Sequence, residues 1–255
     1  MKKLISLITR IFPRQMLIRF SYLFSLLIRP FYWGNKVECP ICGGHFRKFL
    51  PYGYGEAMDN RLCPKCLSLE RHRLLWLYLK EKTGFFTDNL KVLHFAPEQP
   101  FLKRFRALKN LDYTTADIDS PIADLNLDVT EMNIPDNQYD VLICNHVLEH
   151  VDNVDKAFSE IKRVLKPGGW AILMVPINPD VDTFEDPSVT DPEERKRLFG
   201  QYDHVRQFGR DYADVLSKAG FKVTADRLYY ELPDEKREKM HLTRKGEELV
   251  YVAKV

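Results

Sequence analysis

The sequence predicts an α/β protein in which a doubly wound, mainly parallel sheet follows a small four-cysteine module and a basic helical arm. Three observations support this prediction. From residue 89 onward, short apolar runs alternate with helical stretches, a pattern typical of parallel sheets. Four of the five cysteines form two C-P-x-C pairs. The first 37 residues contain seven Lys or Arg and no acidic residue, although the 255-residue chain has a net charge of only +2. We therefore expect three parts, residues 1–36, 37–88 and 89–255.

The arm, residues 1–36, is too interrupted for a signal peptide or a membrane span. Its longest uncharged run has nine residues, whereas a span needs about 20, and no small-residue cleavage site follows. Lys3, Arg10 and Arg14 share one helical stripe. This stripe is typical of a helix that lies on an anionic membrane surface through residues 1–33, and an arm packed on the main domain or on a second subunit explains it equally well. We expect a cytoplasmic protein, peripheral at the inner face of the membrane in the first case.

The four-cysteine module has the spacing of a structural zinc site. Its two C-P-x-C pairs are separated by 20 residues, and two such turns can direct four thiolates to the corners of a tetrahedron. Disulfides or a redox pair fit less well, and iron remains open besides zinc. Residues 37–82 hold eight basic and five acidic side chains, a weak excess that disfavours a nucleic-acid surface. The expected ligands are Cys39, Cys42, Cys63 and Cys66.

The elements of the body follow from its apolar runs. A helix from an N-cap at Ser68 to Lys82 precedes it. The fifth cysteine, Cys144, lies in an apolar run and is expected in the core. The expected strands are 91–95, 113–116, 125–127, 139–144, 170–175, 221–225 and 249–255, and the expected helices are 101–109, 154–165 and 211–218.

Polar side chains follow the first four strands of the body. Parallel sheets bind ligands at the carboxyl ends of their strands, and a carboxylate there has two acceptor oxygens for ribose hydroxyls or for an amino group. Asp117 follows the second strand and Asp128 the third. Helix caps and solvated turns explain each residue alone about equally well.

As a set, these residues resemble the class I S-adenosylmethionine-dependent methyltransferases. The segment Tyr139 to Pro176, with its Leu165-Lys-Pro-Gly-Gly169 turn, is similar to the fourth strand, helix, turn and fifth strand of that superfamily. The resemblance covers residues 89–255 and implies a Rossmann-like seven-stranded sheet and S-adenosylmethionine as the methyl donor. The cofactor-binding residues that it implies are Phe95, Ala96, Glu98, Asp117, Ile118, Asp128, Val129, Asn145 and His146.

The first loop departs from the family pattern. The family has several glycines there, whereas His94 to Pro100 contains none, and glycine is the residue that permits positive φ and close approach to a ligand. Ala96 is small enough for such an approach, and Glu98 has oxygens for the cofactor's amino group. A catalytically inactive protein that binds S-adenosylmethionine, or a nucleic-acid-binding zinc ribbon with an inert body, remains the alternative.

A second motif overlaps this segment. Residues 146–150, His-Val-Leu-Glu-His, match the H-x-x-E-H signature of a class of zinc metalloproteases. That signature requires an exposed helix, but here the motif directly follows a buried strand. We therefore favour the methyltransferase interpretation.

The acceptor site is expected in the insertion after the fifth strand, residues 177–210. His204 is the candidate base, Asp203 the carboxylate that orients it, and Arg206 a cation for an anionic or hydroxylated acceptor. A salt-bridged surface turn is the alternative. The sequence thus predicts methyl transfer to an oxygen or nitrogen of a small-molecule or glycan-like acceptor, and it leaves the oligomeric state open.

Overall fold

The fold is given by a computed structural model, which describes residues 24–53, 58–242, 246 and 248–255. The cationic stripe of Lys3, Arg10 and Arg14 lies outside the described residues. A helical segment over residues 24–32 leads into the first strand. Within the described part of the chain, no helix combines the length and apolar character that crossing a bilayer requires.

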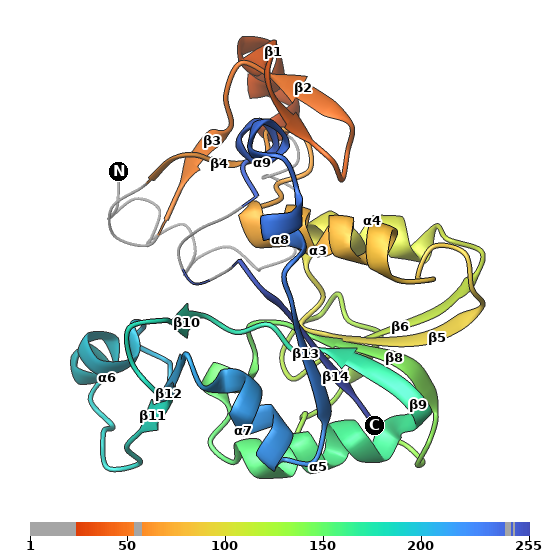
Figure 1. Cartoon of the computed structure of the whole chain (residues 1–255), viewed down its shortest axis with the longest axis vertical. Coiled ribbons are helices and arrows are strands. Elements are labelled where there is room, and N and C mark those ends of the chain that lie inside the picture. The colour runs from red at the N-terminus through yellow and green to blue at the C-terminus, as the bar shows by residue number, and fades with distance from the viewer. Residues whose placement is uncertain (1–23, 54–57, 243–245, 247) are drawn as a thin grey trace.

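The N-terminal module consists of two small antiparallel hairpins and a helix. The hairpins pair β1 with β2 and β3 with β4, and the helix α3 carries the chain toward the body. Helix α9, near the C-terminus, packs beside β1 (Figure 1). The module therefore contacts both ends of the body. Its elements are β1 (Trp33–Cys39), β2 (Gly44–Phe46), β3 (Leu50–Tyr52), β4 (Met58–Leu62) and α3 (Glu70–Lys82).

The body contains the expected seven-stranded, mostly parallel sheet. Its strand order is β13-β14-β9-β8-β5-β6-β7. Neighbours from β9 to β7 are parallel, whereas β14 runs antiparallel to both β9 and β13. From β5, the chain adds β6 and β7 on one side of the sheet and then β8 and β9 on the other. The carboxyl ends of β5 and β8 therefore flank the switch point at which such sheets bind ligands. The strands are β5 (Leu90–Phe95), β6 (Leu111–Asp117), β7 (Leu125–Asn126), β8 (Tyr139–Cys144), β9 (Leu165–Ile172), β13 (Lys222–Asp226) and β14 (Val250–Lys254).

Helices cover both faces of this sheet. Figure 1 shows α3 and α4 on one face and α5 and α7 on the other. Helix α5 starts at the N-cap Asn153, whose side chain accepts a hydrogen bond from the Lys156 backbone N–H. The helices of the body are α4 (Gln99–Arg106), the 3-10 helix η1 (Leu148–His150), α5 (Val154–Val164), α6 (Pro192–Phe199), α7 (Tyr212–Lys218), α8 (Leu228–Glu231) and α9 (Asp234–Met240).

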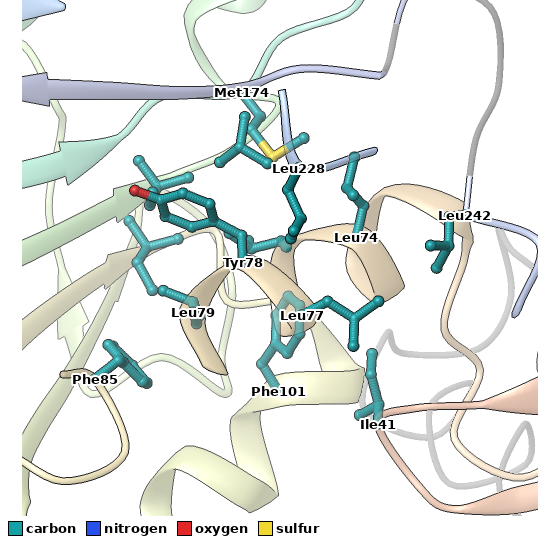
Figure 2. Close-up of a cluster of buried hydrophobic side chains, with 14 of the residues drawn as sticks. Ile41, Leu74, Leu77, Tyr78, Leu79, Phe85, Phe101, Met174, Leu228 and Leu242 are labelled. Atoms are coloured by element: carbon teal, nitrogen blue, oxygen red, sulfur yellow. The ribbon is translucent and has the colours of Figure 1, made fainter. Parts of the chain in front are cut away.

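The core has two halves because successive side chains of a strand point to opposite faces. In β8, Val141 and Ile143 join the half under α3 and α4, whereas Leu142 and Cys144 join the half under α5 and α7. Cys144 is fully buried, as expected. Figure 2 shows the first half, in which apolar side chains of α3 meet residues from α4, the sheet and the C-terminal segment. This half is continuous with the apolar interior of the four-cysteine module.

Several element boundaries differ by a few residues from the sequence prediction, and those of α3 and β9 have a clear structural cause. Helix α3 begins after Leu69, and Ser68 does not cap it but contacts the sulfurs of Cys39 and Cys66, each at 3.3 Å. Strand β9 begins at Leu165 and ends at Ile172 instead of covering 170–175, because its pairing with β8 already starts at Leu165 and continues across an irregularity. Tertiary contacts decide both boundaries.

The insertion before α7 forms a small three-stranded sheet beside the main one. Strand β12 pairs with β10 in parallel and with β11 in an antiparallel sense. Helix α6 precedes β12, starts at the N-cap Asp191 and ends at Gly200, which has a left-handed φ of 88°. The strands are β10 (Ile177–Asn178), β11 (Phe184–Glu185) and β12 (Arg206–Gly209).

Candidate functional site

The carboxyl ends of the central strands open onto a cleft of about 670 Å³. Segments after β5, β6, β7 and β8 form its walls, and η1 and the turn before β12 close one side. We call it the donor cleft. Of the nine residues that the resemblance implied, seven line it, namely Phe95, Ala96, Asp117, Ile118, Asp128, Val129 and His146. Residues from four separate strand ends thus come together as the sheet topology requires.

Asp117 and Asp128 each have one carboxylate oxygen tied to the backbone. Oδ1 of Asp117 accepts from the N–H groups of Asp119 at 2.9 Å and Ser120 at 2.7 Å. Oδ1 of Asp128 accepts from the N–H and the hydroxyl of Thr130 at 2.7 and 2.8 Å. These turns fix the direction of both carboxylates, so Oδ2 of each is the oxygen that remains for a ligand.

In the first loop, which contains no glycine, an alanine adopts the left-handed conformation. Ala96 has a φ of 47°, and its N–H donates to the carbonyl of Ala116 in β6 at 2.9 Å. This conformation costs a non-glycine residue about 1–2 kcal/mol. The tight turn is therefore kept under strain, and the small side chain of Ala96 lies in the wall of the donor cleft.

Glu98 and Asn145, the other two residues, do not line this cleft. Oε1 of Glu98 accepts from Nε2 of His72 at 2.7 Å, and Oε2 accepts from Nδ2 of Asn145 at 3.1 Å. The oxygen of Asn145 accepts from the Met174 N–H at 3.3 Å. Burial alone would raise the pKa of Glu98, but the charge and hydrogen bond of His72, with His94 and Arg71, lower it well below its usual value. Glu98 thus lies outside the donor cleft and connects α3 to the end of β8, and its contact with the cofactor's amino group stays a prediction.

A second pocket of about 360 Å³ adjoins the donor cleft. His146 and His150 line both cavities, so these two side chains form the shared wall. The module supplies the opposite wall, including Arg71 of α3, and the insertion supplies Gln201 and His204. We call this the acceptor pocket. Its position between module and body makes both parts of the chain necessary for its shape.

His204 lies in the wall of the acceptor pocket and is held through one ring nitrogen. Its Nδ1 lies 3.0 Å from the carbonyl oxygen of Phe199, to which it donates, so the Nε2 lone pair remains available. Burial lowers the pKa of His204, against the opposing charge of Glu149, and so favours the neutral ring. Its geometry suits a base or a ligand.

The two residues expected to assist His204 are bound to other partners. Oδ2 of Asp203 is 3.5 Å from Nδ1 of His150, so Asp203 is paired with His150, and the Phe199 carbonyl orients His204 instead. Arg206 is buried, with its guanidinium bound to the carbonyls of three residues and to a carboxylate. Those partners are Leu148, Val151, Asp152 and Glu185. The expectation that Arg206 binds the acceptor is corrected, because this guanidinium fastens η1 to β12.

The H-x-x-E-H motif does not form a helical two-histidine site. Its first residue, His146, has a left-handed φ of 54°, and only residues 148–150 are helical, as one 3-10 turn. Nδ1 of His146 lies 3.3 Å from Oε1 of Glu149. The three residues whose ligand atoms converge within 4.8 Å are instead Glu149, His150 and His204. The arrangement therefore differs from the one that the protease signature requires.

The four cysteines of the module form one cluster. Sγ of Cys39 is 3.5 Å from that of Cys66, and Sγ of Cys42 is 3.7 Å from that of Cys63. All four sulfurs lie within 4.8 Å of one another, and the thiols are free. Zinc bonds of about 2.3 Å place the sulfurs of a tetrahedron about 3.8 Å apart. The cluster thus has the size of a zinc-thiolate site.

Helix α3 contributes side chains to the site that the sequence did not predict. Arg71 lines the acceptor pocket and His72 binds Glu98, although both precede the body by some 20 residues. Nε of Arg71 is buried without a hydrogen-bond partner among the described residues and lies 3.8 Å from Glu98. The Arg-His-Arg run was visible in the sequence. The side of the sheet edge that these side chains face could not be predicted, because it depends on how α3 packs against the sheet.

Comparison with known proteins identifies the central part of the body. Residues 83–173, from the end of α3 to just past β9, match a family model described as a methyltransferase domain. These residues are similar to a methyltransferase domain. This match confirms the prediction of an enzyme and supports S-adenosylmethionine as the methyl donor that the sequence resemblance implied.

The individual proteins to which this chain is similar are distant. Over 134 residues it is 28% identical to the ubiquinone/menaquinone biosynthesis C-methyltransferase UbiE of Hydrogenovibrio crunogenus, covering 52% of this chain and 44% of that protein. Over 51 residues it is 37% identical to the hybrid PKS-NRPS synthetase mpsA of Macrophomina phaseolina, covering 20% and 1%. The chain thus spans less than half the length of these curated relatives. A solved S-adenosylmethionine-dependent methyltransferase from Archaeoglobus fulgidus is similar at a TM-score of 0.45 and 16% identity, over 72% of this chain and 94% of that one.

Proposed function

We propose that this methyltransferase binds S-adenosylmethionine in the donor cleft and transfers its methyl group to an oxygen or nitrogen of an acceptor in the acceptor pocket. The observation that carries the proposal is the shared wall of His146 and His150 between two adjoining cavities. A methyl group that leaves the donor cleft past this wall enters the acceptor pocket directly. The reaction is an in-line displacement, so most of the catalysis is positioning.

Each residue of the donor cleft has a distinct part in this proposal. Oδ2 of Asp117 accepts from the ribose hydroxyls, and Oδ2 of Asp128 accepts from the adenine amino group, since the other oxygen of each is bound to the backbone. Ala96 allows the cofactor to approach the first loop. His204 acts on the acceptor through the Nε2 lone pair that its Phe199 contact leaves available.

The polar lining of the acceptor pocket favours a hydroxylated acceptor of the small-molecule or glycan-like class. Gln201 and His204 offer hydrogen-bonding groups, and Arg71 offers a guanidinium for an anionic substituent. An apolar carbon acceptor would leave these groups without partners, at a cost of about 1–3 kcal/mol for each buried one.

Calorimetric titration of the purified chain with S-adenosylmethionine and with S-adenosylhomocysteine tests the cofactor half of this proposal. We expect one site for each ligand. If neither ligand gives a heat of binding, the proposal is rejected and a body without cofactor-binding activity is favoured. The acceptor half is tested with labelled S-adenosylmethionine and panels of glycans, small hydroxy compounds and amines. The assay detects whether the label is transferred to oxygen, nitrogen or carbon.

We propose that the four-cysteine cluster holds one structural zinc ion. The sulfur spacing supports a tetrahedral site, and four thiolates with Zn²⁺ carry a net charge of −2. The fully buried Arg73 supplies an opposing charge close to this cluster: its guanidinium donates to four backbone carbonyls, including that of Ser68, which adjoins the sulfurs. The zinc would stabilise the wall that the module contributes to the acceptor pocket.

We propose that the arm holds the enzyme on an anionic membrane surface. In the described part of the arm and the start of β1, five large apolar side chains are exposed, namely Phe24, Leu26, Leu27, Phe31 and Trp33. Ser25 faces the other way and donates from its hydroxyl to the carbonyl of Pro64. One face of this segment therefore contacts the module while the apolar face is free for a bilayer interface.

A further inference from the structure

Three side chains with metal-binding groups converge in the wall between the two cavities. Glu149 and His150 come from η1, and His204 comes from the turn before β12, more than 50 residues later in the chain. One ligand atom of each lies within 4.8 Å of the other two. All three side chains line the acceptor pocket, and His150 also lines the donor cleft.

Both histidines have a second hydrogen-bond contact of the kind that metal-binding histidines have. Nδ1 of His204 contacts the carbonyl of Phe199 at 3.0 Å, and Nδ1 of His150 contacts the carbonyl of Asp203 at 3.2 Å. A ring nitrogen that contacts a carbonyl oxygen carries the proton, so the lone pair of each ring is on Nε2. Metal-binding histidines typically have this second contact, which fixes the tautomer and the ring direction. The two rings meet edge to face, with centroids 4.8 Å apart.

The third group, Glu149, is an incompletely satisfied buried carboxylate. Its side chain is 2% exposed. Oε1 lies 3.3 Å from Nδ1 of His146, whereas Oε2 has no hydrogen-bond partner among the described residues. A buried carboxylate oxygen without a partner is costly, and a cation at this place would satisfy it.

We propose that Glu149, His150 and His204 bind a divalent cation of the manganese-to-zinc series. Two imidazoles and one carboxylate suit such ions, and bonds of about 2.0–2.2 Å hold ligand atoms roughly 3–4 Å apart, which small side-chain movements achieve here. Three protein ligands leave coordination positions open toward the acceptor pocket. If the proposed function holds, the cation orients the acceptor's hydroxyl groups beside the methyl donor, and His204 acts on the acceptor through the cation.

The competing explanation is a hydrogen-bonded cluster without a cation, in which His204 takes the acceptor's proton itself. Charged groups face the cluster from several elements. Asp203 lies 3.5 Å from His150 and adds negative charge, and Arg71 of α3 adds positive charge across the acceptor pocket. A cation is distinguished from this alternative by direct binding, which does not depend on knowledge of the acceptor.

The test is a titration of the full chain as purified, with Mn²⁺ as the probe. Mn²⁺ prefers oxygen and nitrogen ligands, so the four-thiolate cluster does not compete for it. We expect one Mn²⁺ site by calorimetry and by loss of the free-ion electron paramagnetic resonance signal. The variants His150→Ala and His204→Ala should each weaken the site at least tenfold, and the exposed His45→Ala in β2 is the matched control that should keep it.

Thermal unfolding of the same samples shows whether the variants are folded. Mn²⁺ should raise the melting temperature of the parent chain and of His45→Ala but not that of the two site variants. Absence of a Mn²⁺ site in the parent chain, or equal affinity in all four proteins, would overturn the metal proposal. S-adenosylhomocysteine binding is measured separately on the parent chain: if it fails while Mn²⁺ binds, the proposed function is rejected and the metal site stands.

Discussion

Replacement of Asp117 by Asn should weaken cofactor binding without disturbing the turn that holds this side chain. The amide oxygen of Asn can keep the position of Oδ1, which accepts from the N–H groups of Asp119 and Ser120. The amide nitrogen then takes the position of Oδ2 and can only donate. The ribose hydroxyls thus lose a charged acceptor, worth about 1.5–3 kcal/mol. Because 1.4 kcal/mol corresponds to a tenfold change in affinity, the Kd should rise about ten- to a hundredfold.

Calorimetry with S-adenosylhomocysteine measures this change, because that ligand keeps the ribose and does not react. Asp119→Asn is the matched control: Asp119 lines the same cleft and loses the same charge, but it holds no ribose hydroxyl in our proposal, so its effect should stay below about threefold, as for an exposed charge. Unchanged affinity in Asp117→Asn, or a larger loss in Asp119→Asn, would refute the assignment of the ribose to Asp117.

Three further predictions concern the metal, the acceptor and the arm. Metal analysis should find one tightly held zinc per chain. The double variant Cys39→Ser, Cys63→Ser should lose this zinc and have a lower melting temperature. Retention of zinc in the double variant would exclude the cluster as its site. His204→Ala should lower turnover about 10²- to 10⁴-fold with cofactor affinity nearly intact, and full turnover would make His204 a structural residue. A chain that begins at Lys36 should lose binding to phosphatidylserine vesicles and keep its cofactor affinity, whereas equal vesicle binding with a reduced melting temperature would favour a packed arm.

The sheet was predictable because its strands are strongly patterned. The expected strand at 139–144 coincides with β8, and both faces of its second half are buried, so the apolar run at 141–144 was the signal. The Asp117 and Asp128 turns were predictable for a related reason, since polar residues that directly follow buried strands must lie at the carboxyl edge of the sheet. The boundaries of β9 and α3 were less accurate, because strand pairing and the cysteine cluster decide where these elements begin.

The hydrogen-bond partners of Glu98, Asn145 and Arg206 could not be predicted from the sequence. In the expected topology, each lies at or near a position that faces a ligand. In the structure, however, the polar atoms of each side chain are hydrogen-bonded to other residues of the protein. These partners, such as His72 on α3, are distant in the sequence. Spacing along the chain carries no information about them.

The sequence by itself determined the seven-stranded body, the four clustered cysteines and the edge at which the donor cleft opens, because periodicity and short spacing fix which residues share a strand, a turn or an edge. Only the tertiary structure decided that the module closes an acceptor pocket over that edge, and that Glu149, His150 and His204 meet in its wall. The physical reason is that these contacts depend on the packing of α3 and of the insertion against the sheet, and packing is set by shape complementarity between segments far apart in the chain.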